Sequence, residues 1–231
     1  MVDSAKRVLM VYTSHDKLGE TEEKTGWYLP EAAHPYAVFK AAGYTITHAS
    51  PKGGVAPLDA GSIDLNDAEN KTFWEGEGKN LTETTVKLSD CKTDDYDAIF
   101  FVGGFGTMWD FPEDADVHRL SKELYESGKV VSAVCHGPCA LVNVKLTSGE
   151  FLIKGQEVAG FTNAEEDAVK RREIVPFTCE DKIKANGGTH KGAGVFEVCV
   201  AVSGTDGRLI TGQNPPSAKV TAEAVVAKLS A

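Results

Sequence analysis

The sequence predicts an α/β protein built on a mostly parallel sheet with helices on both faces. Two observations lead to this fold class. Apolar runs of strand length alternate with segments of helical period, and the strand-like runs are continuously apolar instead of alternating with polar residues. Continuous apolar strands are typical of a sheet that is covered on both faces. The β-α-β order indicates that successive strands run parallel.

The first part of the chain predicts a strand, a helix and a second strand. Val8–Tyr12 and Thr45–Ala49 are the strand-like segments. Between them, Glu31–Ala42 has apolar residues on one face. We expect Pro35 to lie in the first turn of this helix, where its missing N–H is tolerated, and Gly43 to end it.

The stretch from Pro51 to Asp94 is polar and acidic, with a weak helical pattern at Leu81–Leu88. It is long for a structureless loop. We therefore expect an acidic surface insertion at 51–94 that contains some helix. No linker divides the chain, so residues 1–231 are predicted to form a single domain.

The second part of the chain supplies further strands and helices. Val117, Leu120 and Leu124 mark one face of a helix that ends at Gly128, and Pro215-Pro216-Ser217 is a plausible start for the last helix. The expected strands are Tyr96–Val102, Val130–Val134, Val195–Val202 and Arg208–Thr211.

Charge and hydropathy exclude several classes of function. The net charge of −10 disfavours nucleic acid or an anionic membrane as a partner. The tight basic cluster Lys170-Arg171-Arg172 is interpreted as a solvated helix face. No apolar stretch is long enough to span a bilayer, and the N-terminus lacks a signal-peptide pattern. We expect a cytoplasmic protein whose five cysteines are thiols.

The segment AVCHGPCAL, residues 133–141, carries the strongest chemical signal. Cys135 follows an expected strand, and His136-Gly137-Pro138 fits a sharp turn into a helix, which is the pattern of a nucleophile elbow. Free N–H groups at a helix start stabilise a thiolate and bind an oxyanion. Cys139 and the other three cysteines are interpreted as core packing, because thiols are often buried.

The segment Gly103-Gly104-Phe105-Gly106-Thr107 also ends an expected strand. It matches neither a Walker loop nor a dinucleotide fingerprint, so we interpret it as a second source of oxyanion donors. No HExxH or CxxC spacing is present, and no metal site is expected. The histidines weighed as ligands are scattered along the chain: His34, His118, His136 and His190.

Several motifs together resemble the ThiJ/PfpI superfamily. They are AVCHGP, GGFGT, GFTNAEED at Gly160–Asp167 and TGQNPPSA. The resemblance implies a flavodoxin-like three-layer sandwich related to class I glutamine amidotransferases. Two more segments, Lys24–Tyr36 and Gly104–Pro112, are most similar to the heat-shock branch. That branch contains glutathione-independent glyoxalases, also called D-lactate dehydratases, some of which act as holding chaperones.

The resemblance also implies roles for particular residues. Cys135 matches the nucleophile and His136 the adjacent histidine, while Glu31 matches a carboxyl that hydrogen-bonds the thiol. Glu166 matches the acid that orients the histidine, with its neighbour Glu165 as the alternative. The backbone N–H groups of Gly104 and His136 match the oxyanion donors.

The activity implied is conversion of a small α-oxoaldehyde, methylglyoxal, to D-lactate in the stress response. It needs no cofactor, because the electrons stay within the substrate. Many relatives are dimers, so a homodimer is expected. A cysteine peptidase or amidohydrolase, or a stress chaperone and oxidation sensor, are the alternative functions.

Overall fold

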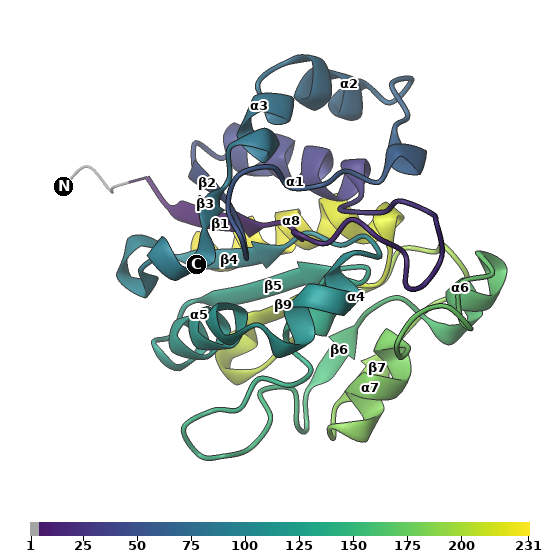
Figure 1. The fold of residues 1–231 in the computed structure, drawn as a ribbon. Coiled ribbons are helices and arrows are strands. Elements are labelled where there is room, and N and C mark those ends of the chain that lie inside the picture. Colours follow the sequence, from purple (N-terminus) through teal and green to yellow (C-terminus); the bar gives the residue numbers. More distant parts are fainter. Residues whose placement is uncertain (1–4) are drawn as a thin grey trace.

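A seven-stranded sheet forms the centre of the protein and lies between layers of helices (Figure 1). The computed structural model describes residues 5–231; the first four residues of the N-terminal segment, judged above for a signal peptide, lie outside the described residues. The strand order is β3-β2-β1-β4-β5-β9-β8. All neighbours pair in parallel except β8 and β9. The predicted fold class is confirmed.

The strands of the sheet are short, and those at its centre are buried, whereas β3 and most of β8 at its edges are not. Their bounds are β1 Arg7–Val11, β2 Thr45–Ser50, β3 Val86–Lys87, β4 Ala98–Phe101, β5 Val130–Val134, β8 Val200–Ser203 and β9 Leu209–Gly212. A separate two-stranded sheet pairs β6 (Glu157–Ala159) with β7 (Thr189–Lys191). The carboxyl ends of β1, β4 and β5 therefore meet at one edge of the main sheet, where open α/β sheets bind ligands.

Helices cover both faces of the main sheet. One layer contains α1 (Leu29–Ala41) and α8 (Ala218–Leu229), and the opposite layer contains α4 (Thr107–Asp110) and α5 (Ala115–Glu126). The other α-helices are α2 (Ala68–Glu75), α3 (Gly78–Glu83), α6 (Asn163–Ala168) and α7 (Cys179–Ala185). The two α-helices of the 51–94 insertion, α2 and α3, lie beyond α1 in Figure 1.

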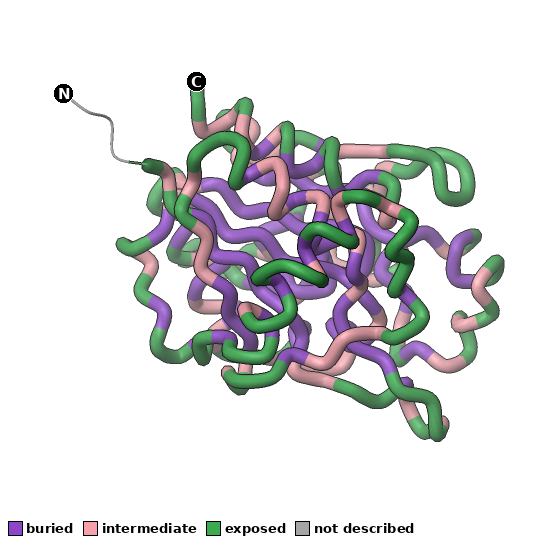
Figure 2. The backbone as a smooth tube through the Cα atoms, turned by 90° about the horizontal axis from the view of Figure 1, so that it is seen from above, coloured by how far each residue is buried: buried purple, intermediate pink, exposed green. Residues whose placement is uncertain are grey.

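Two apolar cores, one on each face, hold the layers together. Successive side chains of a strand point to opposite faces. In β1, Leu9 belongs to the core under α5, whereas Met10 belongs to the core under α1 and α8. The central strands consequently show as continuous buried backbone in Figure 2. Burial on both faces explains why the central strands β1, β4 and β5 are largely apolar.

Several local predictions were wrong. α1 begins at Leu29, so Pro35 lies inside the helix instead of in its first turn. The Leu81–Leu88 pattern is not one helix, because α3 ends at Glu83 and β3 follows. The expected strand Val195–Val202 starts only at Val200, since Phe196 has a φ of 57°, which no strand accommodates.

The basic cluster does not form a helix face. α6 ends at Ala168, and Lys170 has a left-handed φ of 58°. Arg171 instead forms an ion pair with Glu23, and Arg172 with Asp167. Across residues 5–231, no helix has the length and apolarity that a membrane crossing requires.

Candidate active site

Cys135 lies directly after β5, at the carboxyl end of a central strand. Its φ is 61°, in the left-handed region that a side chain with a Cβ rarely adopts. Two backbone hydrogen bonds hold it there: its N–H donates to the Gly212 carbonyl at 2.9 Å, and its own carbonyl accepts from the Phe161 N–H at 2.9 Å. A backbone strained in this way and fixed by its neighbours is typical of a nucleophile elbow.

The element after Cys135 is shorter than predicted. Gly137–Ala140 forms a 3₁₀ helix of four residues, with His136 as its N-cap. A single short turn has a much smaller dipole than an α-helix. The helix therefore contributes little to stabilising a thiolate, and the chemistry of Cys135 depends on its side-chain neighbours.

His136 connects the thiol to a carboxylate. Its Nδ1 lies 3.4 Å from Cys135 Sγ, and its Nε2 lies 2.7 Å from Glu166 Oε1. The imidazole is packed against Phe105 and Phe161, with ring centroids 4.5 and 4.4 Å away. Because the carboxylate accepts the Nε2 proton, Nδ1 is left as an acceptor facing the thiol.

The carboxyl of Glu165 has other partners. It accepts five hydrogen bonds of 2.8 to 3.0 Å, from the Thr162 N–H and hydroxyl, the Phe196 N–H, and the side-chain amides of Gln213 and Asn214. Both carboxyls are fully buried. Of these two neighbours, the structure places Glu166 against His136 and Glu165 in a separate network.

Glu31 projects from the first turn of α1 into the space beside Cys135. A Cβ on Gly103 would clash with Glu31 Oε2 and would lie 2.9 Å from Cys135 Cβ, so the absent side chain leaves room for the carboxyl. Glu31 is fully buried, and neither oxygen has a partner of ordinary hydrogen-bond geometry within residues 5–231. Burial raises the pKa of Glu31 well above its usual value, although the Cys135 thiol and the Gly103 N–H oppose this.

The pKa of Cys135 moves in the opposite direction to the sequence-based expectation. Burial raises the pKa of the thiol well above its usual value, and the neighbouring charge of Glu31 raises it further. The His136 N–H lowers the pKa, but to a smaller extent. At rest, the site therefore favours a protonated thiol over a preformed thiolate.

Gly104 follows β4 and has a φ of 108°. A Cβ there would lie 2.8 Å from both Trp27 Cα and Tyr28 N, so only glycine fits this approach of two backbones. Among the described residues, no oxygen accepts a hydrogen bond from the N–H of Gly104 or of His136. Neither N–H is therefore committed to a protein oxygen, and that of His136 lies against the Cys135 sulfur.

Tyr28, which sequence reasoning did not name as a site residue, lies next to this group: its N–H donates to the Gly103 carbonyl at 3.1 Å. Burial, followed by the charges of Glu31 and Cys135, raises the pKa of its hydroxyl. The signal in the sequence was its position just before the segment that carries Glu31. The two neighbouring tryptophans have other ring partners. Trp27 packs in the core against Tyr12 and Phe73, and Trp109 stacks on His15.

The thiol is nearly closed off from solvent, with Cys135 only 4% exposed. A cavity of about 370 Å³ is lined in part by Phe105, the ring that packs on His136, and by Asp59 and Arg171.

A strained cysteine at the end of a central parallel strand, paired with a buried histidine, places the protein among α/β proteins with a nucleophile elbow. The chain belongs to the DJ-1/PfpI family, whose family model matches residues 26–228. The resemblance to the ThiJ/PfpI superfamily is confirmed.

The similar proteins extend over nearly the whole chain. "Glyoxalase 3" of Candida albicans is 34% identical, over 96% of this chain and 97% of its own. "Glutathione-independent glyoxalase HSP31" of Saccharomyces cerevisiae is 32% identical, over 94% and 95%. The structure of Rapid Encystment Protein 24 kDa from Francisella tularensis has a TM-score of 0.92 and 40% identity, over 97% and 99%. That of glyoxalase III from Candida albicans has a TM-score of 0.84 and 33% identity, over 96% and 97%.

Proposed function

We propose that this protein is a glutathione-independent glyoxalase, or D-lactate dehydratase, that converts methylglyoxal to D-lactate at Cys135. The observation that carries the proposal is the continuous chain of side chains from Glu31 through Cys135 and His136 to Glu166. Two relatives above 30% identity are named as enzymes of this type, which supports the same activity.

In the first step, the Cys135 sulfur adds to the aldehyde carbon C1 of the substrate. His136 Nδ1 takes the thiol proton, and Glu166 stabilises the imidazolium that forms. The aldehyde oxygen becomes negative and is received by the N–H groups of Gly104 and His136. Transfer of the proton from His136 to this oxygen gives a neutral hemithioacetal.

In the second step, a proton moves from C1 to C2. Glu31, as a carboxylate, removes the C1 proton, which gives an enediolate with its negative charge on the C2 oxygen. The C1 hydroxyl proton passes to this oxygen, and the protonated Glu31 returns its proton to C2, which leaves a lactoyl thioester. C1 is oxidised and C2 is reduced, so no external electron acceptor is required. A buried carboxyl with a raised pKa is the stronger base for this task.

In the last step, water attacks the thioester carbon and the Cys135 sulfur leaves. His136 removes a proton from the water and returns one to the thiol, so the enzyme regains its starting state. The product is lactate. Because Glu31 delivers the proton to C2 from one side only, a single enantiomer forms.

The test measures D-lactate and L-lactate separately after incubation with methylglyoxal in the absence of glutathione. The wild-type protein is expected to form D-lactate, and Cys135→Ala to form none above background. Cys199→Ala is the matched control and is expected to retain turnover, because Cys199 is half-buried outside these contacts. Equal turnover by wild type and Cys135→Ala would overturn the proposal.

The near-complete burial of Cys135 favours a small substrate over a peptide, because an extended chain needs an open groove at the nucleophile.

A chaperone role has one observation in its favour. Val195, Phe196, Val198 and Val202 are each 42 to 53% exposed, in and before the edge strand β8. Suppression of client aggregation that persists in Cys135→Ala would assign this activity to the surface instead of the thiol.

The homodimer and the cytoplasmic location are part of the proposal. The exposed apolar side chains in and before β8 support self-association, and five free cysteines support a reducing compartment. Sedimentation velocity of the purified protein tests the first: a monomer at all concentrations would exclude the dimer. Fractionation of the source cells tests the second.

A further inference from the structure

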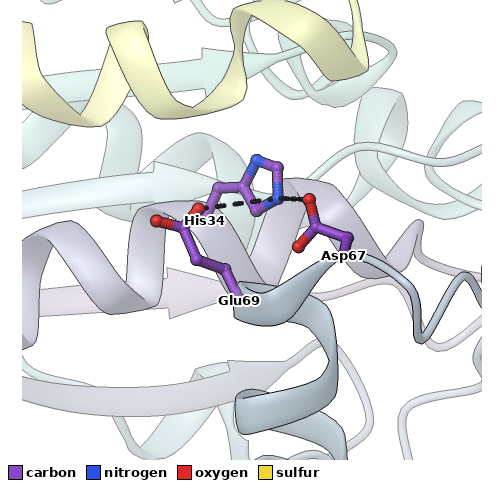
Figure 3. Close-up of side chains that lie close together, drawn as sticks. All are labelled: His34, Asp67 and Glu69. Atoms are coloured by element: carbon purple, nitrogen blue, oxygen red, sulfur yellow. Dashed lines mark hydrogen bonds and ion pairs between the residues drawn. The ribbon is translucent and has the colours of Figure 1, made fainter.

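One imidazole and two carboxylates converge away from Cys135, where α1 meets the start of α2 (Figure 3). His34 Nε2 lies 3.1 Å from Asp67 Oδ2 and 3.6 Å from Glu69 Oε2. All three ligand atoms lie within 4.8 Å of one another. We infer that these side chains form a binding site for a divalent transition-metal ion of the zinc type.

The spacing of the three atoms fits tetrahedral coordination. Zinc binds nitrogen and oxygen at about 2.0–2.2 Å, which places neighbouring ligand atoms roughly 3.3 Å apart. The distances of 3.1 and 3.6 Å from His34 Nε2 lie on either side of this value. Small rotations of the carboxylates are therefore sufficient to admit an ion. A nitrogen in the donor set favours zinc-like metals over calcium and magnesium, which prefer oxygen ligands alone.

Each carboxylate uses one oxygen for a structural partner and presents the other to His34. Asp67 Oδ1 caps α2 by accepting the Asn70 N–H at 2.8 Å, and Oδ2 faces the imidazole. Glu69 Oε1 accepts from Lys219 Nζ at 2.8 Å, and Oε2 faces the imidazole. Partners of this kind orient metal ligands before the ion arrives.

Exposure and charge also fit an ion. The three side chains are 20%, 36% and 34% exposed, so a hydrated ion reaches them without unfolding. Lys219 balances only one of the two carboxylates when His34 is neutral. A dication supplies the missing charge, and water completes its coordination. The competing occupant is a proton on His34, which would make the cluster an ion pair only.

The site joins elements that are distant in sequence. His34 belongs to α1, Asp67 and Glu69 to the insertion, and Lys219 to α8. A bound ion would hold the insertion on α1, one turn after Glu31. Since the unfolded chain does not hold these ligands together, binding is expected to stabilise the native state.

The test uses the full chain carrying Cys135→Ala, so that the thiol and His136 do not offer a second site. After treatment with a chelator and dialysis, the protein is titrated with Zn²⁺ by calorimetry and with Co²⁺ by visible absorption, and Tm is measured with and without the metal. One ion per chain and a rise in Tm are expected.

Adding His34→Gln to this background is expected to weaken binding at least about tenfold and to abolish the rise in Tm. His118→Gln is the matched control and should leave both unchanged, because within residues 5–231 the His118 imidazole has a hydrogen bond only to the Pro112 carbonyl. Glu69→Gln, which retains an oxygen for Lys219, provides a second variant. Absence of metal binding in the Cys135→Ala protein would overturn the inference and leave the cluster as an ion pair. So would an affinity equal to that of the Cys135→Ala protein in both His34→Gln and Glu69→Gln.

Discussion

Glu165 and Glu166 are adjacent in the chain, yet their carboxyls have different surroundings. Glu166 has a single side-chain partner, the imidazole of His136, whereas Glu165 accepts five hydrogen bonds from the surrounding loops. The first arrangement fits the proposed role of Glu166 in proton transfer, whereas the second holds loops in place. Conservative substitutions at the two positions are therefore expected to have separate effects.

Glu166→Gln is expected to lower kcat by about a hundredfold or more. The amide cannot stabilise the imidazolium as a carboxylate does, and it favours the wrong tautomer of His136. The free energy of unfolding should change little, because the shape and one acceptor oxygen remain. Steady-state kinetics with methylglyoxal and urea unfolding provide the two measurements. Wild-type kcat in this variant would contradict the assigned role.

Glu165→Gln is expected to destabilise the protein by about 2–3 kcal/mol, since it replaces charge-assisted hydrogen bonds to a buried carboxylate. The amide nitrogen of the glutamine would also place a hydrogen-bond donor against groups that themselves donate to the carboxyl. Urea unfolding followed by circular dichroism measures the loss. If stability were unchanged while kcat fell, the two glutamates would have exchanged roles.

At the scale of elements, Asp110, the last residue of α4, ties this helix to the segment that follows β1. Its carboxyl accepts from the Thr13 hydroxyl and from the Ser14 N–H at 2.7 Å. Burial raises the pKa of Asp110 to about 7, although these hydrogen bonds oppose the shift. The folded state therefore disfavours the ionised form.

The sign of the resulting pH dependence follows from this shift. The pKa is higher in the folded state than in the unfolded state, so the stabilising contribution is complete below about pH 4 and is lost as the pH rises through about 7. Between pH 5 and 7.5, the free energy of unfolding of wild type relative to Asp110→Asn should fall by about 2–3 kcal/mol. Urea unfolding at both values measures this difference. A constant or rising difference would show that Asp110 ionises normally.

The end of β4 also limits which residue can follow the strand. A side chain on Gly103 would meet Glu31 Oε2 and the Val134 carbonyl, both of which are buried. Gly103→Ala is expected to cost about 1–3 kcal/mol through overpacking and to displace the Glu31 carboxyl from Cys135. Thermal unfolding and kcat are both expected to fall. Gly149→Ala is the control. A Cβ there meets nothing within 4 Å, so any loss of stability comes from its positive φ, and kcat should not change.

At the scale of the whole molecule, all five cysteines are free, and four of them are buried. Thiol titration of the unfolded protein without reductant should give five equivalents. In the native protein, Cys199 is expected to react before the buried thiols, because it alone is half-buried. Fewer than five equivalents after unfolding would indicate a disulfide and contradict a reducing location.

Much of the fold could be predicted because the local pattern of apolar residues indicates which segments are buried. The apolar run Val130–Val134 and the turn residues after Cys135 are sufficient to place a cysteine at the end of a buried strand. Local pattern was insufficient at Val195–Val202, where a left-handed Phe196 and the contact of its N–H with Glu165 override the strand propensity. Pro35 was misplaced because tertiary packing of α1 tolerates a missing helical hydrogen bond.

The sequence by itself determined the layered α/β architecture, the position of Cys135 and its neighbour His136, and through family resemblance the residues expected to act with them. Only the tertiary structure decided which glutamate reaches His136 and that burial raises the pKa of the thiol. It alone showed that His34, Asp67 and Glu69 meet, although the sequence predicts no metal site. The physical reason is that distances between side chains depend on how elements remote in sequence pack together, and desolvation depends on the closed core that this packing creates.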